Sequence, residues 1–457
     1  MRHVLPVLAA AALLPAAARA DCIATPPGGT TYECLGFDPA TGDPDPTPDG
    51  LSDTRDGLDV EVDLIVEDGP LVIDALRIPG AGNTVRVTGA IVAPRGAAIA
   101  GGPDLTVILG TVPAPGDPPQ SALIEAGNGI DVGAAAGLTV DLAGGGDFDV
   151  SGTAIRGGNG AAVTGGAFFA TGNYRAIDLG DDSTVTFAGD GAGVSNVAIG
   201  SGGGSAVKLG ANSAFSIGAG GSILGRTSDD PLPGTGVEIV SGSFFSESSI
   251  AGRGAGGVGL RITGTGGVTT IDNGFEGALE GDDYAILVEG GDSNASVQRV
   301  VNFGSLGDVD LGGGNDEMRV ADQMAFTGQT DLGAGMDLLT LVDTVDGLNG
   351  FGLFDGGAGF DAAVFEGFAL ADLLDLSEAG GILSFGFDEG LGLPDPTLVF
   401  ELANFESYVF DDAAFTTTQL RAAFDLGPAV IPLPAAGWLL LAGLGGLALR
   451  RRRPAGA

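Results

Sequence analysis

Apolar and polar residues alternate in short runs from about Leu58 to Val301, and turns rich in Gly, Asn, Asp and Ser separate these runs. Nowhere in this region do apolar residues recur every third or fourth position over several turns, as they would in an amphipathic helix. The pattern therefore predicts short β-strands joined by tight turns.

One four-residue pattern, apolar at its second and fourth positions, recurs through this region. Its copies are Gly129–Val132, Ala176–Leu179, Ala206–Leu209, Gly236–Ile239, Gly259–Ile262 and Ala285–Val288, with a looser copy at Ala154–Ile155. The second residues of successive copies, starting from Ile130, are separated by 25, 22, 30, 30, 23 and 26 residues. These intervals are typical of one coil of a solenoid whose repeats stack on one another.

A second alternating run follows several copies after a short turn, as at Thr184–Phe187 and Ala214–Ile217, so each coil should supply at least two strands. One coil alone has no means of burying its Ile, Val and Leu side chains, whereas stacked coils place each above its counterpart. The residue between two apolar positions, such as Asp131 or Lys208, should then face solvent. We predict an all-β fold, a right-handed parallel β-helix, with an antiparallel sandwich or several small β domains as the alternative.

The composition supports an elongated molecule. Of 457 residues, 84 are Gly and 44% are apolar, but only 6% are aromatic. A core of small aliphatic side chains suits a long solenoid better than a compact globule. The mean hydropathy of +0.31 is too high for a chain that stays a solvated coil.

The formal net charge of −40 restricts the partners. A body this acidic repels phosphate backbones and anionic lipid headgroups, so we expect no binding to nucleic acids or peripheral binding to membranes. Cations are the natural partners, although high acidity also keeps an exported protein soluble.

The first twenty residues predict a secretory signal peptide. A basic start at Arg2 is followed by an apolar run and the small-residue ending Ala18-Arg19-Ala20, with cleavage before Asp21. Cys22 and Cys34 are the only cysteines, and in an oxidising compartment we expect them to form a disulfide that closes a short loop.

The other end carries a second targeting signal. Residues 431–449 form an apolar stretch that opens on Pro432, Leu433, Pro434 and Ala435 and is followed by four arginines, Arg450–Arg453. The stretch barely reaches the roughly 20 residues that span a bilayer, and the arginines would hold its end in the cytoplasm.

This tail resembles the VPLPA-CTERM sorting signal, a relative of the PEP-CTERM signals of Gram-negative bacteria, with Ile431 inserted between Val430 and Pro432. The resemblance implies processing by an exosortase-type membrane protease and a place at the cell surface or in an exopolysaccharide or biofilm matrix. The segment from Cys22 to Val62 is loosely similar to the opening of autotransporter-type adhesin passengers, although no outer-membrane barrel follows it in this sequence.

Three copies of Asp-x-Gly-x-Gly-x-Asp follow at intervals of 21 and 24 residues, close to one coil. Each copy precedes an apolar strand, and in the third copy Val364 is the only residue that marks this strand. Glycines allow the positive φ angles that turn carbonyl oxygens inward, and Ca²⁺ prefers such oxygens together with carboxylates. The candidate calcium ligands are Asp310, Asp316, Asp331, Asp337, Asp355 and Asp361.

The third copy most closely resembles the RTX calcium-binding element, although the nine-residue period of RTX rolls is absent. Ordinary Asp-Gly turns without metal are the competing interpretation. We expect calcium as the only cofactor.

No catalytic site stands out in the sequence. The single histidine, His3, lies in the signal peptide, and no pair of carboxylates is distinguished from the many others. The alternative is a polysaccharide-acting β-helix enzyme, a lyase or hydrolase, in which Arg175 or Arg261 would act beside calcium, an option that rests on fold analogy alone.

The leading hypothesis is a non-enzymatic exported surface or matrix protein with an adhesive or structural role. Its only membrane contact would be the C-terminal hydrophobic helix, and its partners would be the processing protease and possible exopolysaccharide or surface ligands. The segment 398–412 should cap the last coil. The predicted divisions are a signal peptide at 1–20, an N-terminal cap at 21–90, a parallel β-helix at 91–302, Asp/Gly coils at 303–365, a C-terminal cap at 366–428 and the sorting tail at 429–457.

Overall fold

The computed structural model describes most of residues 75–426. Its gaps are residues 79, 111–121, 134–136, 143–145, 166–167, 173–174, 188–197, 202–203, 226–233, 322–327, 343–351, 388–397 and 425. Before residue 75, and for residues 168–172 and 198–201, it describes backbone strands only. The predicted signal peptide and sorting tail, including Pro432 to Ala435, lie outside the described residues and stay predictions.

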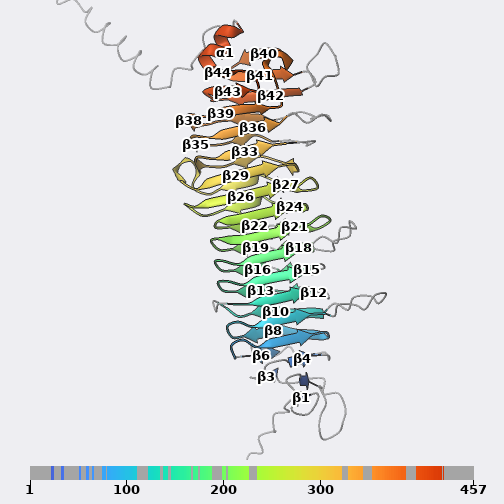
Figure 1. The fold of residues 1–457 in the computed structure, drawn as a ribbon. Coiled ribbons are helices and arrows are strands. Elements are labelled where there is room, and N and C mark those ends of the chain that lie inside the picture. The colour runs from blue at the N-terminus through green and yellow to red at the C-terminus, as the bar shows by residue number, and fades with distance from the viewer. Residues whose placement is uncertain are drawn as a thin grey trace, which may run out of the picture.

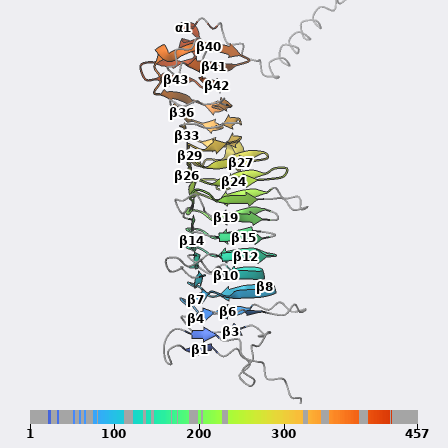
Figure 2. The same ribbon diagram turned by 90° about the vertical axis from the view of Figure 1, so that its right-hand side faces the viewer.

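The chain is an all-β parallel solenoid, which confirms the predicted fold class (Figure 1). One coil consists of β12 (Gly146–Val150), β13 (Thr153–Gly157) and β14 (Ala162–Gly165), and each of these strands pairs in parallel with its counterpart one coil later. Each such coil therefore supplies three strands, where the sequence indicated at least two. The strands stack one above another along one axis (Figure 2). Their pairings group them into three faces.

The first face continues from β12 in both directions. Its other strands are β5 (Leu64–Ile65), the first parts of β8 (Ala90–Gly101) and β10 (Ala122–Asp131), β15 (Phe168–Gly172), β18 (Ala198–Ser201), β21 (Ser222–Gly225), β24 (Ser249–Gly252), β27 (Ala278–Gly281) and β30 (Ser305–Leu306).

The second face contains β13 and carries the repeated tetrads. Its other strands are β3 (Leu51–Ser52), β6 (Leu76–Ile78), the second parts of β8 and β10, β16 (Arg175–Leu179), β19 (Ser205–Leu209), β22 (Thr235–Ile239), β25 (Val258–Ile262), β28 (Tyr284–Val288), β31 (Val309–Asp310), β34 (Thr330–Asp331), β37 (Leu353–Asp355) and β42 (Leu398–Ala403).

The third face contains β14. Its other strands are β2 (Tyr32–Cys34), β4 (Leu58–Val60), β7 (Thr84–Val87), β9 (Thr106–Leu109), β11 (Thr139–Leu142), β17 (Thr184–Phe187), β20 (Ser213–Ile217), β23 (Gly242–Ser246), β26 (Val268–Asn273), β29 (Val297–Asn302), β33 (Glu317–Val320), β36 (Leu338–Val342), β39 (Ala362–Glu366) and β43 (Ser407–Phe410).

The register of the second face is the one that the tetrads predicted. Strand pairing aligns the second tetrad residues one above another, and each has no exposed surface. These residues are Ile130, Ile155, Ile177, Val207, Val237, Leu260 and Ile286. Because side chains alternate across a strand, a slip of one residue would turn this whole row to solvent. Burial of the row thus holds the coils in register.

One local expectation was wrong. Val364 was expected to be the inward residue of its strand, but it faces outward, and its neighbours Ala363 and Phe365 are fully buried. The pairing of Leu339 with Ala363 and of Leu341 with Phe365 sets this alternation. The small Ala363 is a poor apolar marker in sequence, and for that reason the pattern placed the strand one residue out of phase.

The C-terminal end is closed by elements that break the parallel pattern. Segment 398–412, which was expected to cap the last coil, instead forms that coil: β42 and β43 pair in parallel with β37 and β39. The closing elements are β40 (Leu373–Ala379), β41 (Ile382–Phe387) and β44 (Ala414–Thr416), which pair with antiparallel neighbours. Helix α1 (Thr417–Ala423) follows and buries Leu420. Packed aromatic rings fill this end, among them Phe365, Phe368, Phe385, Phe387, Phe400 and Phe410.

No helix in the described part of the chain is long and apolar enough to cross a membrane. At the N-terminal end, β1 (Cys22–Ala24) pairs antiparallel with β2, and the register places Cys22 opposite Cys34. The disulfide between these two residues stays a prediction. Parallel pairing reaches back to β2 and β4, within the segment predicted as the N-terminal cap.

Candidate functional site

The six candidate calcium ligands lie in two separate rows. Asp310, Asp331 and Asp355 end successive strands of the second face, where pairing places them one above another; we call them the outer row. Asp316, Asp337 and Asp361 directly precede successive strands of the third face; we call them the inner row. The outer residues are half-buried (Asp310 and Asp355) or exposed (Asp331), whereas the inner residues are 0%, 2% and 0% exposed.

Glycine-rich turns separate the two rows. Their backbones pair as a small parallel sheet of β32 (Gly313–Gly314), β35 (Ala334–Gly335) and β38 (Ala358–Gly359). The turns are so close that a Cβ on Gly333, which has a φ of +91°, would lie 1.4 Å from the carbonyl oxygen of Gly312. Glycine is therefore required here by the stacking of the backbones as well as by φ.

The outer row uses its carboxylates to shape the turns. In each residue Oδ1 accepts the backbone N–H of the glycine two positions later, at 2.9 Å in all three coils. This is the local hydrogen bond by which Asp favours turns. It leaves the second carboxylate oxygen free of this turn hydrogen bond.

An open groove of about 460 Å³ lies along the outer row. Burial raises the pKa of Asp310 and of Asp331, and nearby carboxylates add to the rise. The groove thus concentrates negative charge on the second face. Its acidic and aromatic lining consists of Asp282, Asp283, Tyr284, Asp308, Asp310, Asp331 and Asp355.

The inner row links coil to coil. Asp316 Oδ1 accepts the backbone N–H of Gln298 (2.6 Å), Asp337 Oδ1 accepts that of Asp316 (2.7 Å), and Asp361 Oδ1 accepts that of Asp337 (2.9 Å). The other oxygen of each carboxylate, Oδ2, is buried and has no hydrogen-bond partner. Each carboxylate therefore has one satisfied and one unsatisfied oxygen.

The protonation of the inner row reflects this environment. Burial raises the pKa of Asp316 and of Asp337 to about 7 and that of Asp361 to about 6. Nearby negative charges add to each rise: that of Asp337 at Asp316, that of Asp361 at Asp337, and that of Glu406 at Asp361. A hydrogen bond between the carboxyl groups of Asp337 and Asp361 further raises the pKa of Asp337 and lowers that of Asp361. Parallel strands are about 4.8 Å apart, so successive charges in a low dielectric repel strongly. A row of unpaired anions is costly unless protons or cations neutralise it.

A cation in the inner row would depend on few carboxylates. Within the described residues, no group of three or more His, Cys, Asp or Glu side chains is arranged to hold a metal ion. A cation here would instead be held by two carboxylates from adjacent coils, together with backbone carbonyl oxygens of the glycine turns. Ca²⁺ accepts such an all-oxygen set and fills its remaining positions with water.

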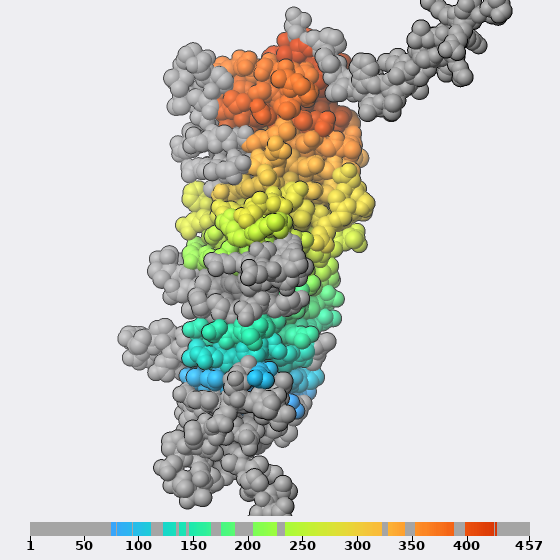
Figure 3. Space-filling model, turned by 180° about the vertical axis from the view of Figure 1, so that it is seen from behind, coloured from blue at the N-terminus to red at the C-terminus, as the bar shows by residue number. Residues whose placement is uncertain are grey.

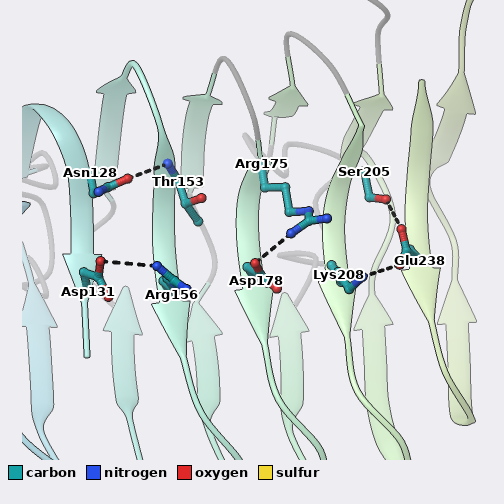
Figure 4. Close-up of polar contacts among 9 residues, drawn as sticks. All are labelled: Asn128, Asp131, Thr153, Arg156, Arg175, Asp178, Ser205, Lys208 and Glu238. Carbon is teal, nitrogen blue, oxygen red and sulfur yellow. Dashed lines mark hydrogen bonds and ion pairs between the residues drawn. The ribbon is translucent and has the colours of Figure 1, made fainter. Parts of the chain in front are cut away.

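A ladder of alternating charges occupies the outward position of the second face. Consecutive coils place an acidic and a basic side chain in turn at this position, and several of them form ion pairs (Figure 4). The ladder then passes through Leu287 into the outer row, where the alternation ends and three aspartates follow one another. The alternating members are Asp131, Arg156, Asp178, Lys208, Glu238 and Arg261.

Glu238 is the most tightly held acid of this ladder. Its side chain is 14% exposed, Lys208 Nζ lies 2.6 Å from Oε1, and Ser205 Oγ donates to Oε2. Burial alone would raise the pKa of Glu238, but the hydrogen bonds from Lys208 and Ser205 outweigh it and leave that pKa lowered. The ladder thus joins neighbouring coils by charge as well as by backbone pairing.

No family model, curated protein or solved structure matches the chain.

The remaining predicted site residues have structural partners. Arg175 Nη1 lies 2.9 Å from Asp178 Oδ2, and Arg261 Nη1 lies 2.8 Å from Glu289 Oε1, so both arginines suggested for an enzyme take part in ion pairs on the second face. Neither lines the acidic groove.

The sequence missed one residue of the inner row. Pairing of Ala362 with Ser407 places Glu406 in the row position one coil after Asp361. Glu406 follows Asn404 and Phe405 without the glycines that mark the three repeats, so the repeat motif gives no signal for it. The strand register locates it: Phe365 pairs with Phe410, and counting back along both strands places Glu406 beside Asp361.

Proposed function

We propose that the protein is a non-enzymatic exported surface or extracellular-matrix protein with a structural or adhesive role, whose C-terminal coils are stabilised by calcium. Its long body, over which the colours of the chain succeed one another along the axis, suits a spacer or a display surface (Figure 3). The predicted signal peptide and the sorting tail support export and processing by an exosortase-type protease. The acidic surface supports cations as partners.

Calcium binding is supported mainly by the unsatisfied Oδ2 atoms of the inner row. Buried polar atoms almost always have a partner, and a buried carboxylate oxygen without one is especially costly. Here the same atom is unsatisfied in three successive coils, at Asp316, Asp337 and Asp361. An unsatisfied oxygen that recurs at the same position in each coil is better explained by a bound ligand than by an isolated packing defect.

The chemistry of a bound calcium ion matches what the inner row lacks. The ion would supply positive charge between neighbouring carboxylates and so remove their mutual repulsion. The glycine turns leave backbone carbonyls close by, and each carbonyl has two lone pairs, of which stacking uses one, as in the bond from Ala334 N to Gly312 O (3.0 Å).

Thermal melting of the purified full chain tests this proposal. We expect added CaCl₂ to raise Tm, and excess EDTA to lower it, because a ligand that binds only the folded state stabilises it by mass action. MgCl₂ at the same concentration is the control and should have a smaller effect, since Mg²⁺ gives up its water shell reluctantly. Superimposable melting curves in EDTA and CaCl₂ would rule out the calcium site.

A polysaccharide-acting enzyme is the second candidate, and the groove along the outer row is the observation that favours it. Paired carboxylates in a groove are the usual machinery of glycoside hydrolysis. The purified full chain should be incubated with acidic and neutral polysaccharides, and new reducing ends and unsaturated products measured. We expect none. Turnover that disappears in an Asp310→Asn, Asp331→Asn double variant would instead establish the enzyme.

A further inference from the structure

The inner row does not end with the third repeat. Asp361 N donates to Glu406 Oε2 at 2.8 Å, the same kind of contact that Asp316 N makes with Asp337 and Asp337 N makes with Asp361. The backbone N–H groups of Glu406 and Ser407 both donate to Asp361 O, at 3.0 and 3.1 Å. Glu406 therefore occupies the fourth position of the row in both backbone and side chain.

The opposite end of the row is closed by a neutral amide. The carboxamide of Gln298, oriented so that its oxygen accepts from Ser296 Oγ (2.7 Å), donates through Nε2 to Asp316 Oδ1 (2.7 Å) and to Leu311 O (3.1 Å). One coil earlier, the residue that pairs with Gln298 is Thr269, which is also uncharged. The row of carboxylates thus runs from Asp316 to Glu406 and contains three gaps between neighbours.

Glu406 also contacts the C-terminal cap, by which we mean residues 414–424, β44 and α1, that close the solenoid beyond the last coil. Its carbonyl oxygen accepts the N–H of Thr417 at 3.0 Å, the first residue of α1. The carbonyl oxygen of the preceding residue, Phe405, accepts from Thr417 Oγ1 (2.6 Å) and from Tyr408 OH (3.2 Å). A ligand held between Asp361 and Glu406 would therefore connect the repeat coils to the start of this helix.

We infer that Glu406 is the terminal cation ligand of the inner row, so that calcium in the gap between Asp361 and Glu406 couples the repeat coils to docking of the C-terminal cap. This inference rests on the proposed calcium binding. Beyond that binding, the inference assigns a calcium ligand outside the repeats, Glu406, and makes docking of the cap depend on calcium. The cap is held loosely when calcium is removed and tightly when calcium is bound.

The test compares the full-length wild type with Glu406→Gln and with Glu401→Gln, a matched change at an exposed glutamate of β42. Calcium binding is measured by titration calorimetry with CaCl₂, and hydrogen exchange is followed in residues 407–424 with CaCl₂ and with EDTA. In wild type and E401Q we expect calcium to slow exchange in this segment. In E406Q we expect fewer ions bound and no such slowing, with calcium-dependent protection of β33 and β36 retained.

The outcomes separate the two proposals. Calcium binding by E406Q equal to wild type in both stoichiometry and affinity overturns the role of Glu406 and leaves the calcium proposal intact. Absence of calcium binding in wild type overturns both. If E406Q does not fold, the wild-type exchange data decide, because a cap whose exchange is indifferent to calcium is not coupled to the row. Glu406→Asp, which keeps the charge, should bind more calcium than E406Q if it folds.

Discussion

The two oxygens of the Asp337 carboxylate have different surroundings. Oδ1 accepts the N–H of Asp316 at 2.7 Å, while Oδ2 is buried without a partner. Outer-row aspartates, only six residues away in sequence, use Oδ1 for a local turn and keep their remaining oxygen near the surface. Aspartate thus forms turns in the outer row, whereas in the inner row it leaves a buried carboxylate oxygen without a partner.

Asp337→Asn separates the proposed cation site from the hydrogen bond. The asparagine oxygen can still accept from Asp316 N, while the neutral amide removes a buried charge from the row, so stability in EDTA should be unchanged or higher. Calcium affinity should fall by at least about tenfold, since even second-shell changes at metal sites cost this much. Differential scanning calorimetry and calcium titration measure both effects. A large loss of stability in EDTA with unchanged calcium affinity would contradict this interpretation.

Lys208→Met tests the charge ladder. It leaves Glu238 largely buried without its cation, and we expect a loss of about 1–3 kcal/mol in the free energy of unfolding near neutral pH. In wild type, the lowered pKa of Glu238 gives stability that is present above the unfolded-state pKa and is lost as pH falls through the folded-state pKa. The difference between variant and wild type should therefore be smaller at about pH 3.5, because burial raises the pKa of the unpaired Glu238 in the variant and its carboxyl is already neutral at that pH.

Denaturant unfolding at both pH values measures this difference. Arg156→Met is the matched control, because Arg156 is 54% exposed and its Nη1 lies 3.9 Å from Asp131 Oδ2. It should cost about 0–1 kcal/mol, as exposed ion pairs usually do. Equal losses for the two variants, or a K208M difference that is constant with pH, would show that the ladder contributes little.

At the scale of elements, the turns are as restrictive as the strands. Strands of the three faces are short, commonly four to six residues, and each gains its stability from the coils above and below. In the Asp/Gly coils, glycines of successive turns lie nearly in backbone contact. The spacing between turns therefore depends on the absence of side chains there.

Gly333→Ala tests this requirement. Its Cβ would lie 1.4 Å from Gly312 O, so the turns must separate, and we expect a loss of about 3 kcal/mol or more, above the 1–2 kcal/mol cost of a positive φ alone. Gly82→Ala is the control, since Gly82 has a φ of +73° but nothing within 4 Å of the added Cβ. Denaturant unfolding should show a clearly larger effect for Gly333, and equal effects would exclude the clash.

At the scale of the whole molecule, the solenoid must end without exposing an open strand edge. Parallel stacking would continue past β43, but β44 pairs with it in the antiparallel direction and α1 follows. Arg421 of α1 forms a two-pronged ion pair with Glu378 of β40, at 2.9 and 2.8 Å. These contacts close the end of the solenoid at which an added strand would otherwise pair.

Deletion of residues 414–424 should promote association. It removes β44 and α1 and exposes the edge of β43 together with the aromatic core behind it, and unpaired edges recruit further strands. Light scattering after size-exclusion chromatography should detect larger, concentration-dependent species than for the full chain. Arg421→Ala keeps the cap in place and should leave the mass unchanged. A deletion variant with the mass of a single chain would show that this end needs no cover.

The sequence by itself determined the coil. Inward aliphatic residues recur at coil intervals because each must lie above its counterpart, so the intervals alone predict the register of Ile130, Ile155 and Ile177. The acidic repeats are also visible in the sequence, because Asp and Gly mark turns locally. Alternation and turn preference act over a few residues, and a single sequence records them directly.

The tertiary structure decided how the acidic residues are distributed. The separation of six aspartates into an exposed and a buried row depends on which side of a turn each lies once coils stack, and the sequence alone does not state this. The same holds for Val364, whose outward position follows from the pairing of its neighbours, and for Glu406, which joins the row without any motif. Burial and pairing between coils are long-range effects, and they decide which carboxylates lack a partner.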